Sequence, residues 1–167
     1  LNDYPHAWLY IMNTESGPFA DARVRQAFSM SIDREGLCND ILQGVGTPLA
    51  QLMYPGSPWY AEGVEEYTYN PERAKELLAE AGYPDGFSTT LWCSDTQVMR
   101  DSAVVIQEQL RQVGINAEVK TLESGQFQSE TGNGAHDMFI MSKTSIDPDS
   151  MLRSMYHTAV SYTHLRA

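Results

Sequence analysis

Basic residues are scarce in this chain of 167 residues, which carries 11 Lys and Arg against 22 Asp and Glu and has a formal net charge of −11. A surface that binds nucleic acid needs surplus cations to neutralise phosphates, so we expect no nucleic-acid partner. Long apolar runs are missing as well. The longest, Ala7 to Met12 and Met138 to Met141, fall far short of the ~20 residues of a membrane helix. We therefore expect a globular chain that inserts no part of this segment directly into a membrane.

Cysteines and catalytic motifs are also few. Cys38 and Cys93 lack metal-ligand spacing, which predicts two buried thiols and neither a disulfide framework nor a zinc site. No nucleophile elbow, phosphate-binding glycine loop or dinucleotide fingerprint occurs. His136 and His157 have no Asp, Glu or Cys at ligand spacing, and we expect them at the surface or partly buried. These absences predict a protein with no metal, no cofactor and no enzymatic activity.

Two carboxylates leave one enzymatic alternative open. Asp147 and Asp149 flank Pro148, and paired carboxylates are suited to general acid/base catalysis. Asp149 also stands where a helix N-cap is expected, and Asp147 before a proline is typical of a turn. The structural interpretation is favoured for Asp149, while a hydrolase that uses Asp147 and a histidine remains an alternative.

Hydrophobic periodicity and capping residues predict an alternation of strands and helices. Strands are expected over 6–13, 87–94, 115–122 and 138–141, and the first, apolar on both faces, is expected at the centre of the sheet. Helices are expected after the capping residues Asp21, Asp33 and Asn70, and over 101–113, 126–131 and 149–155. This order is typical of an α/β fold with a mostly parallel sheet and helices on both faces.

Open α/β sheets bind ligands beyond the carboxyl ends of their strands. The segments that follow Asn13, Ser94, Leu122 and Met141 are therefore the first places to look for a site. A long loop over 44–69, rich in proline and glycine, is a further candidate because its aromatic side chains can line a cleft for an organic ligand. Those side chains are Tyr54, Trp59 and Tyr60.

Several stretches of the chain carry a resemblance to a known family. They are Ile11-Met12-Asn13-Thr14, residues 17–28 (Gly-Pro-Phe-Ala-Asp-Ala-Arg-Val-Arg-Gln-Ala-Phe), residues 31–35, residues 69–87 around Asn70-Pro71-Glu72-Arg73-Ala74, residues 106–110 with Gly114-Ile115, and Asp147-Pro148-Asp149. Together they resemble the signature of extracellular solute-binding proteins of family 5, the receptors of the oligopeptide, dipeptide and nickel ABC importers. The resemblance extends over residues 6–158 and implies one lobe of a periplasmic-binding-protein type II-like fold.

The resemblance also implies an organisation and partners. Residues 1–159 would be part of the C-terminal lobe of a longer, two-lobed receptor that binds a small-molecule or peptide ligand and delivers it to ABC permease membrane subunits. Such a receptor is periplasmic, or extracellular and membrane-anchored. Residues 160–167 are similar to a translated sequencing adapter and are expected to be a non-native tail. The alternative is the solute-sensing domain of a transcriptional regulator, since such fusions resemble this family.

The resemblance implies ligand contacts in three regions, of which the third departs from the family pattern. Asn13 matches an asparagine that follows the first strand, and Gln51 and Tyr54 lie near a contacting loop. After the last strand, peptide-binding members resemble Gly-Trp-x-x-Asp, whose acidic residue pairs with the α-amino group of the peptide. Here that segment lacks both the tryptophan and the acid; its candidate contacts are Lys143, Thr144, Ser145 and Asp147. Either Asp147 replaces the missing acid, or Lys143 favours an acidic group on the ligand.

Overall fold

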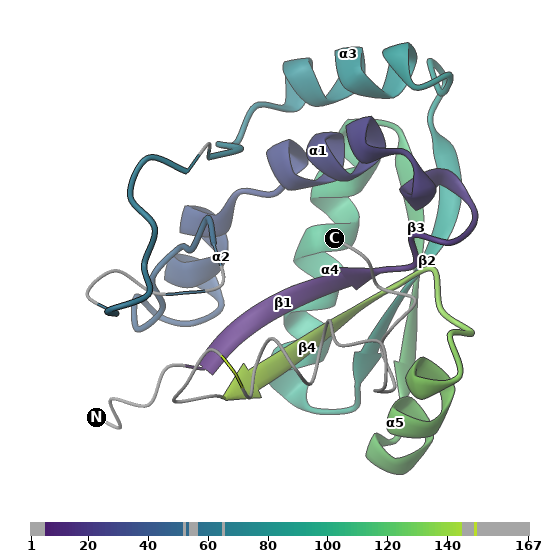
Figure 1. The fold of residues 1–167 in the computed structure, drawn as a ribbon. Coiled ribbons are helices and arrows are strands. Elements are labelled where there is room, and N and C mark those ends of the chain that lie inside the picture. Colours follow the sequence, from purple (N-terminus) through teal and green to yellow (C-terminus); the bar gives the residue numbers. More distant parts are fainter. Residues whose placement is uncertain (1–5, 52, 54–56, 65, 145–148, 150–167) are drawn as a thin grey trace.

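The computed structural model describes residues 6–51, 53, 57–64, 66–144 and 149. Figure 1 shows a twisted sheet with helices against it. The strands are β1 (His6–Met12), β2 (Phe87–Ser94), β3 (Ile115–Leu122) and β4 (Met138–Thr144). The helices are α1 (Ala22–Ser31), α2 (Arg34–Asp40), α3 (Pro71–Glu80), α4 (Gln97–Gln112) and α5 (Ser124–Gly132), with a 3-10 turn η1 (Pro18–Ala20) before α1.

The strands lie in the order β1-β4-β2-β3. β4, β2 and β3 run parallel to one another, and β1 runs antiparallel to β4. The mostly parallel sheet is therefore confirmed, but the expectation that the first strand is central is wrong, because β1 is at one edge of the described sheet. Its unbroken apolar run has another cause. Tyr10 packs toward the helices on one face, while Ala7 and Ile11 pack into a second cluster on the other face.

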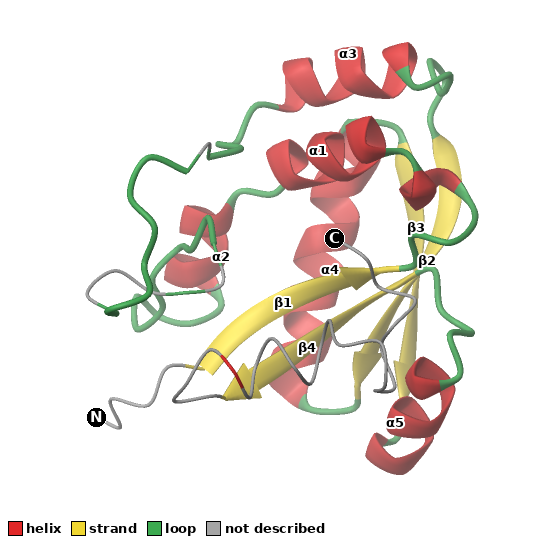
Figure 2. Cartoon of the chain, viewed as in Figure 1, coloured by secondary structure: helices red, strands yellow, loops and turns green. Residues whose placement is uncertain are grey.

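Helices cover both faces of the sheet, as predicted (Figure 2). On one face, α4 packs against β2 and β3, and α1 packs against α3. The main core between these layers joins Phe28 of α1, Leu77 of α3, Ile106 of α4 and Leu91 of β2. On the other face, Phe127 of α5 packs edge-on against Phe139 of β4, with ring centroids 5.5 Å apart.

Local capping explains where the first helices begin. Asp21 accepts a hydrogen bond from the backbone N–H of Arg23 at 2.8 Å, and the caps of α2 and α3 repeat this arrangement. Those caps are Asp33, which accepts from the N–H of Gly36 at 2.9 Å, and Asn70, which accepts from that of Arg73 at 3.0 Å. Each side chain satisfies an N–H that has no partner within the helix. The three capped helices are therefore confirmed.

Two element boundaries differ from the prediction by three residues or more. α4 begins at Gln97, four residues before the expected start at 101, because buried Met99 extends the apolar stripe of Ala103 and Ile106 by one turn. β4 continues past Met141 to Thr144 because it pairs with β1 along its whole length. The helix expected over 149–155 lies outside the described residues, except for exposed Asp149.

A close backbone approach precedes β2 and β3. Gly86 has a φ of 77°, and a Cβ placed on it would lie 1.8 Å from the carbonyl oxygen of Gly114. Only glycine fits there. The N–H of Phe87 donates to that same carbonyl at 3.2 Å, and Phe87 then pairs with Ile115 at the start of the parallel ladder. The two glycines thus position β2 against β3.

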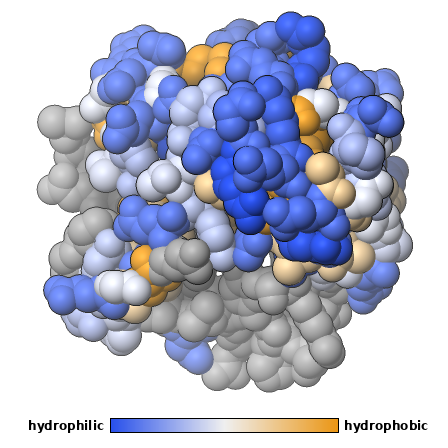
Figure 3. All heavy atoms as spheres, turned by 90° about the horizontal axis from the view of Figure 1, so that it is seen from above, coloured by the Kyte–Doolittle hydropathy of each residue, from blue (hydrophilic) through white to orange (hydrophobic). Residues whose placement is uncertain are grey.

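The outer surface of the helical layer is polar, as Figure 3 shows from above. α3 contributes exposed ion pairs to it. Arg73 pairs with Glu76 at 2.8 Å and with Glu80 at 2.9 Å, and Lys75 pairs with Glu72 at 3.0 Å. Exposed pairs of this kind add little to stability. α3 is therefore held to the molecule by its buried face.

Candidate functional site

A cavity of about 340 Å³ opens between β1, α2 and the long loop. The wall from β1 includes Trp8 and Tyr10, and that from α2 includes Leu37 and Cys38. The loop contributes residues 46–51, and α4 contributes Ser102. Mostly apolar walls with a few polar groups are typical of sites for small organic ligands. This cavity is the candidate functional site.

Gln51 lines the cavity, but its amide is already occupied. The side-chain Nε2 donates to the carbonyl oxygen of Ala61 at 2.8 Å, and the N–H of Ala61 donates back to Oε1 at 3.1 Å. These two hydrogen bonds join the two sides of the long loop. In this geometry Gln51 shapes the rim of the cavity, and a ligand would meet its aliphatic part.

The long loop is also fixed at its end. The Arg34 guanidinium donates to the backbone carbonyl of Tyr67 at 3.0 Å, and Gln26 of α1 donates to the Tyr67 hydroxyl at 3.0 Å. The N–H of Asn70 donates to the carbonyl of Met30 at 2.7 Å. The described part of the loop therefore has partners on α1 and α2.

Lys143 lies close to the β1 wall of the cavity. It pairs with Ala7 across the β1–β4 ladder, and Thr144 pairs with His6. Side chains of directly opposed residues share a face of the sheet, so half-buried Lys143 projects to the face that α5 covers. The cavity and Lys143 thus occupy the same end of the sheet, on opposite faces.

Asn13 lies at the other end. Because β1 runs antiparallel to β4, Asn13 follows the residue that pairs with Met138, at the start of β4. At the strand rise of ~3.4 Å per residue, the distance from Met138 to Lys143 is roughly 17 Å. The structure therefore does not bring Asn13 together with Lys143 and Thr144.

The Asn13 side chain joins β1 to the turn before β4. Its amide nitrogen donates to the carbonyls of Gly134 at 3.4 Å and His136 at 3.3 Å, and its oxygen accepts from the N–H of Glu15 at 3.0 Å. The backbone N–H of Asn13 adds a bond to the carbonyl of Asp137 at 2.8 Å. All of these contacts are architectural.

The structure describes some of the other residues singled out in the sequence and leaves others outside its described ranges. Tyr54, Ser145 and Asp147 lie outside the described residues. On the loop, Trp59 is 55% exposed and Tyr60 is half-buried. Both cysteines are free, as expected, although only Cys93 is fully buried.

The expectation that His136 is at the surface or partly buried is wrong, because it is 1% exposed. Its ring meets Phe139 and Trp92 edge-on, at centroid distances of 4.6 Å and 6.2 Å, and Lys120 covers the outer face of Trp92 at 4.3 Å. A histidine enclosed by aromatic rings cannot reach a substrate. The hydrolase alternative therefore loses this histidine as a general base.

One polar cluster was not foreseen from the sequence. A single carboxylate oxygen of Asp137 accepts from the N–H of Thr90 at 2.9 Å, from its hydroxyl at 2.9 Å and from the Thr89 hydroxyl at 3.3 Å. The acid thereby ties the start of β4 to β2.

Within the described ranges, no group of three or more His, Cys, Asp or Glu side chains is placed to hold a metal ion. No helix there has the length and hydropathy to cross a membrane.

Comparisons with known proteins place the fold. Residues 2–163 match the family model described as bacterial extracellular solute-binding proteins, family 5 Middle. Among curated relatives, the dipeptide-binding protein of Escherichia coli K12 is 33% identical over 156 residues, which are 89% of this chain and 29% of that protein. The glutathione-binding protein GsiB of the same strain is 40% identical over 120 residues, 71% of this chain and 23% of that protein. The chain thus spans less than a third of these relatives.

Solved structures of binding proteins superpose on most of this chain. The periplasmic binding protein DppA of Helicobacter pylori, in complex with the peptide STSA, superposes with a TM-score of 0.85 at 30% identity, over 90% of this chain and 30% of that chain. A Pseudoalteromonas dipeptide-binding protein in complex with Met-Leu gives 0.88 at 26% identity, over 96% and 33%. The predicted lobe of a periplasmic-binding-protein type II-like fold is confirmed, and the chain belongs to the bacterial extracellular solute-binding proteins of family 5.

Proposed function

We propose that this chain is part of a receptor that captures a small, peptide-like solute outside the cytoplasmic membrane and presents it to the membrane subunits of an ABC importer. The cavity between β1, α2 and the long loop carries this proposal, because it lies at the end of the sheet where β4 finishes. Relatives named for dipeptides and glutathione support a peptide-like ligand. No bond is made or broken in this function.

The chain supplies one part of the binding site. Residues 1–159 form part of the C-terminal lobe in this proposal, and a second lobe closes over the ligand. Affinity then comes from exclusion of water and from contacts on both sides of the ligand. The chain alone is therefore expected to bind family ligands very weakly in calorimetry, and micromolar or tighter binding would contradict the half-site.

Lys143 indicates the chemistry of the ligand. It is half-buried at the end of β4, and no described carboxylate lies within ion-pair distance of it. Because Lys143 lies on the other face of the sheet from the cavity, it can meet only a part of the solute that extends past the end of β4, and an ammonium there favours an acidic group. Glutathione is such a solute, since it carries two carboxylates.

The test is calorimetry on the longer receptor that contains this chain, with glutathione, its ethyl ester and neutral dipeptides as ligands. We expect at least one peptide to bind with micromolar affinity and an acidic one to be preferred. Lys143→Ala should weaken the acidic ligand about tenfold or more, the value of a charged hydrogen bond. The control Lys75→Ala removes an exposed lysine paired with Glu72 and should change nothing. If no peptide binds, the proposed function is refuted; if Lys143→Ala has no effect, only the acidic preference is.

A further inference from the structure

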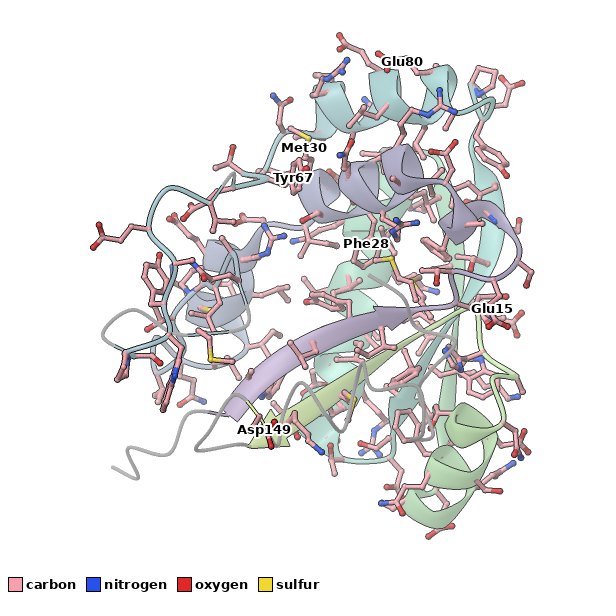
Figure 4. All side chains as sticks on the ribbon, viewed as in Figure 1. Glu15, Phe28, Met30, Tyr67, Glu80 and Asp149 are labelled. Carbon is pink, nitrogen blue, oxygen red and sulfur yellow. The ribbon has the colours of Figure 1, made fainter. Side chains whose placement is uncertain are left out.

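A second cavity, of about 430 Å³, lies between β1 and α1. Of the residues that the structure describes, only Tyr10 and Arg34 line both this cavity and the one proposed for the solute. Its apolar walls include Met12, Phe28 and Ile32. Figure 4 shows Phe28 on the side of α1 that faces β1 and Tyr67 beside the end of α1. A cavity of this size, with apolar walls and a few polar groups, suits a small organic molecule.

The Arg34 guanidinium is the main polar group of this cavity. One terminal nitrogen, Nη1, donates to the Tyr67 carbonyl at 3.0 Å, and the other donates to the Ser29 hydroxyl. The group is half-buried, and burial lowers the pKa of Arg34 from its usual value. Glu66 acts on it only through longer-range electrostatics, and no described carboxylate forms an ion pair with it.

These hydrogen bonds do not fully compensate the positive charge of a guanidinium that is partly buried from water. Within the described part of the chain, two of the five N–H donors of Arg34 have partners, and neither partner carries a charge. Partly buried charges are normally compensated by a charge of opposite sign. Arg25 adds a second guanidinium to the lining, and its Nη1 is held by the carbonyls of Phe19 at 2.8 Å and Ala20 at 3.1 Å. The local charge is therefore positive on a chain whose net charge is −11.

We propose that this cavity binds a small organic carboxylate, with the carboxylate on Arg34 and an apolar body against Met12 and Phe28. The planar guanidinium matches the two oxygens of a carboxylate, and its remaining donors supply the hydrogen bonds. The site does not depend on solute capture at the other cavity. Nonspecific attraction of anions cannot account for binding of a carboxylate here, because the net charge of the chain is negative.

Sodium benzoate is the probe, and benzamide, which has the same shape without the charge, is its control. The thermal midpoint of the chain is measured against the concentration of each, with sodium chloride keeping the ionic strength constant. A ligand that binds only the folded state raises the midpoint in a concentration-dependent way. We expect benzoate to do so with an affinity of about millimolar, as for other ligands of this size, and benzamide to have little effect.

Variants assign the effect to Arg34. Arg34→Gln should weaken benzoate about tenfold or more, and Arg34→Lys, which keeps the charge without the planar fork, should fall between. The control Arg111→Gln removes an exposed arginine paired with Glu108 at 2.7 Å and should keep the full shift. Because Arg34 also holds the Tyr67 carbonyl, each variant is compared with itself in the absence of ligand. If Arg34→Gln does not fold, Arg34→Lys and the benzamide comparison decide. The proposal is overturned by equal shifts with benzoate and benzamide, by no shift, or by an undiminished shift in Arg34→Gln or Arg34→Lys.

Discussion

The close approach between Gly86 and Gly114 can be tested by one methyl group. In Gly86→Ala, the new Cβ would meet the Gly114 carbonyl oxygen at 1.8 Å, far inside any contact that real side chains make. That oxygen is part of the backbone and also accepts from the N–H of Phe87. The clash can be relieved only by moving the start of β2 away from β3, which costs packing along both strands.

The expected size of the effect combines two costs. An alanine with a φ near 77° costs about 1–2 kcal/mol in backbone strain alone. Displacement of the Gly114 backbone adds a cost typical of core disruption, so the free energy of unfolding should fall by about 3 kcal/mol or more. Gly82→Ala is the matched control. Gly82 has a φ of 94° with nothing within 4 Å of its Cβ position, so it reports strain without a clash.

The assay is urea denaturation followed by tryptophan fluorescence, since Trp92 lies on β2 and is 4% exposed. The free energy of unfolding of each variant is compared with that of the parent chain. If Gly86→Ala has no measurable folded population in circular dichroism while Gly82→Ala does, the expectation is also met. Equal destabilisation in the two variants would show that the approach to Gly114 does not constrain the fold, and the reasoning would fail.

Two further predictions concern local contacts. Asn13→Ala should lower the free energy of unfolding by about 1 kcal/mol because the carbonyl of Gly134 loses its donor, whereas exposed Asn116→Ala should have little effect in the same urea titration. The hydrogen bond from the Arg23 side chain lowers the pKa of Asp21 from 3.8 to about 2. Its contribution to stability is thus present above pH 3.8 and is lost as the pH falls through about 2. Titration of the Asp21 carboxyl carbon by NMR measures this, and a midpoint at the ordinary value would contradict it.

The elements that the sequence predicted best depend on neighbours in the chain. Asp21, Asp33 and Asn70 each cap a helix through an N–H two or three residues away, so a local pattern contains the whole interaction. The bounds of β2 and β3 were also predicted correctly. Turn glycines precede both strands, and their positive φ values stop the preceding segments. Such signals need no knowledge of tertiary structure.

The position of β1 could not be predicted in this way. An apolar run from Trp8 to Met12 is expected both for a central strand and for an edge strand covered on two faces. Its partner, β4, lies more than a hundred residues further along the chain, and nothing local specifies the direction in which the two strands pair. The same limit applies to His136, whose burial depends on Trp92 and Phe139 and not on adjacent residues.

The direction of β1 also decides between the predicted ligand contacts. In a fully parallel sheet, Asn13 and the segment after Met141 would lie at the same end of the sheet. The sequence therefore predicted a site near both. Because β1 runs antiparallel to β4, the carboxyl ends of β2, β3 and β4 lie at the same end of the sheet as the start of β1. Asn13 lies at the opposite end. One compact ligand cannot use both ends of the sheet. We therefore expect Asn13→Ala in the longer receptor to lower stability and leave solute affinity unchanged, whereas Lys143→Ala lowers affinity and leaves stability nearly unchanged. Calorimetry and urea titration on the same two variants separate these roles, and a loss of affinity in Asn13→Ala at full folding would return that residue to the binding site.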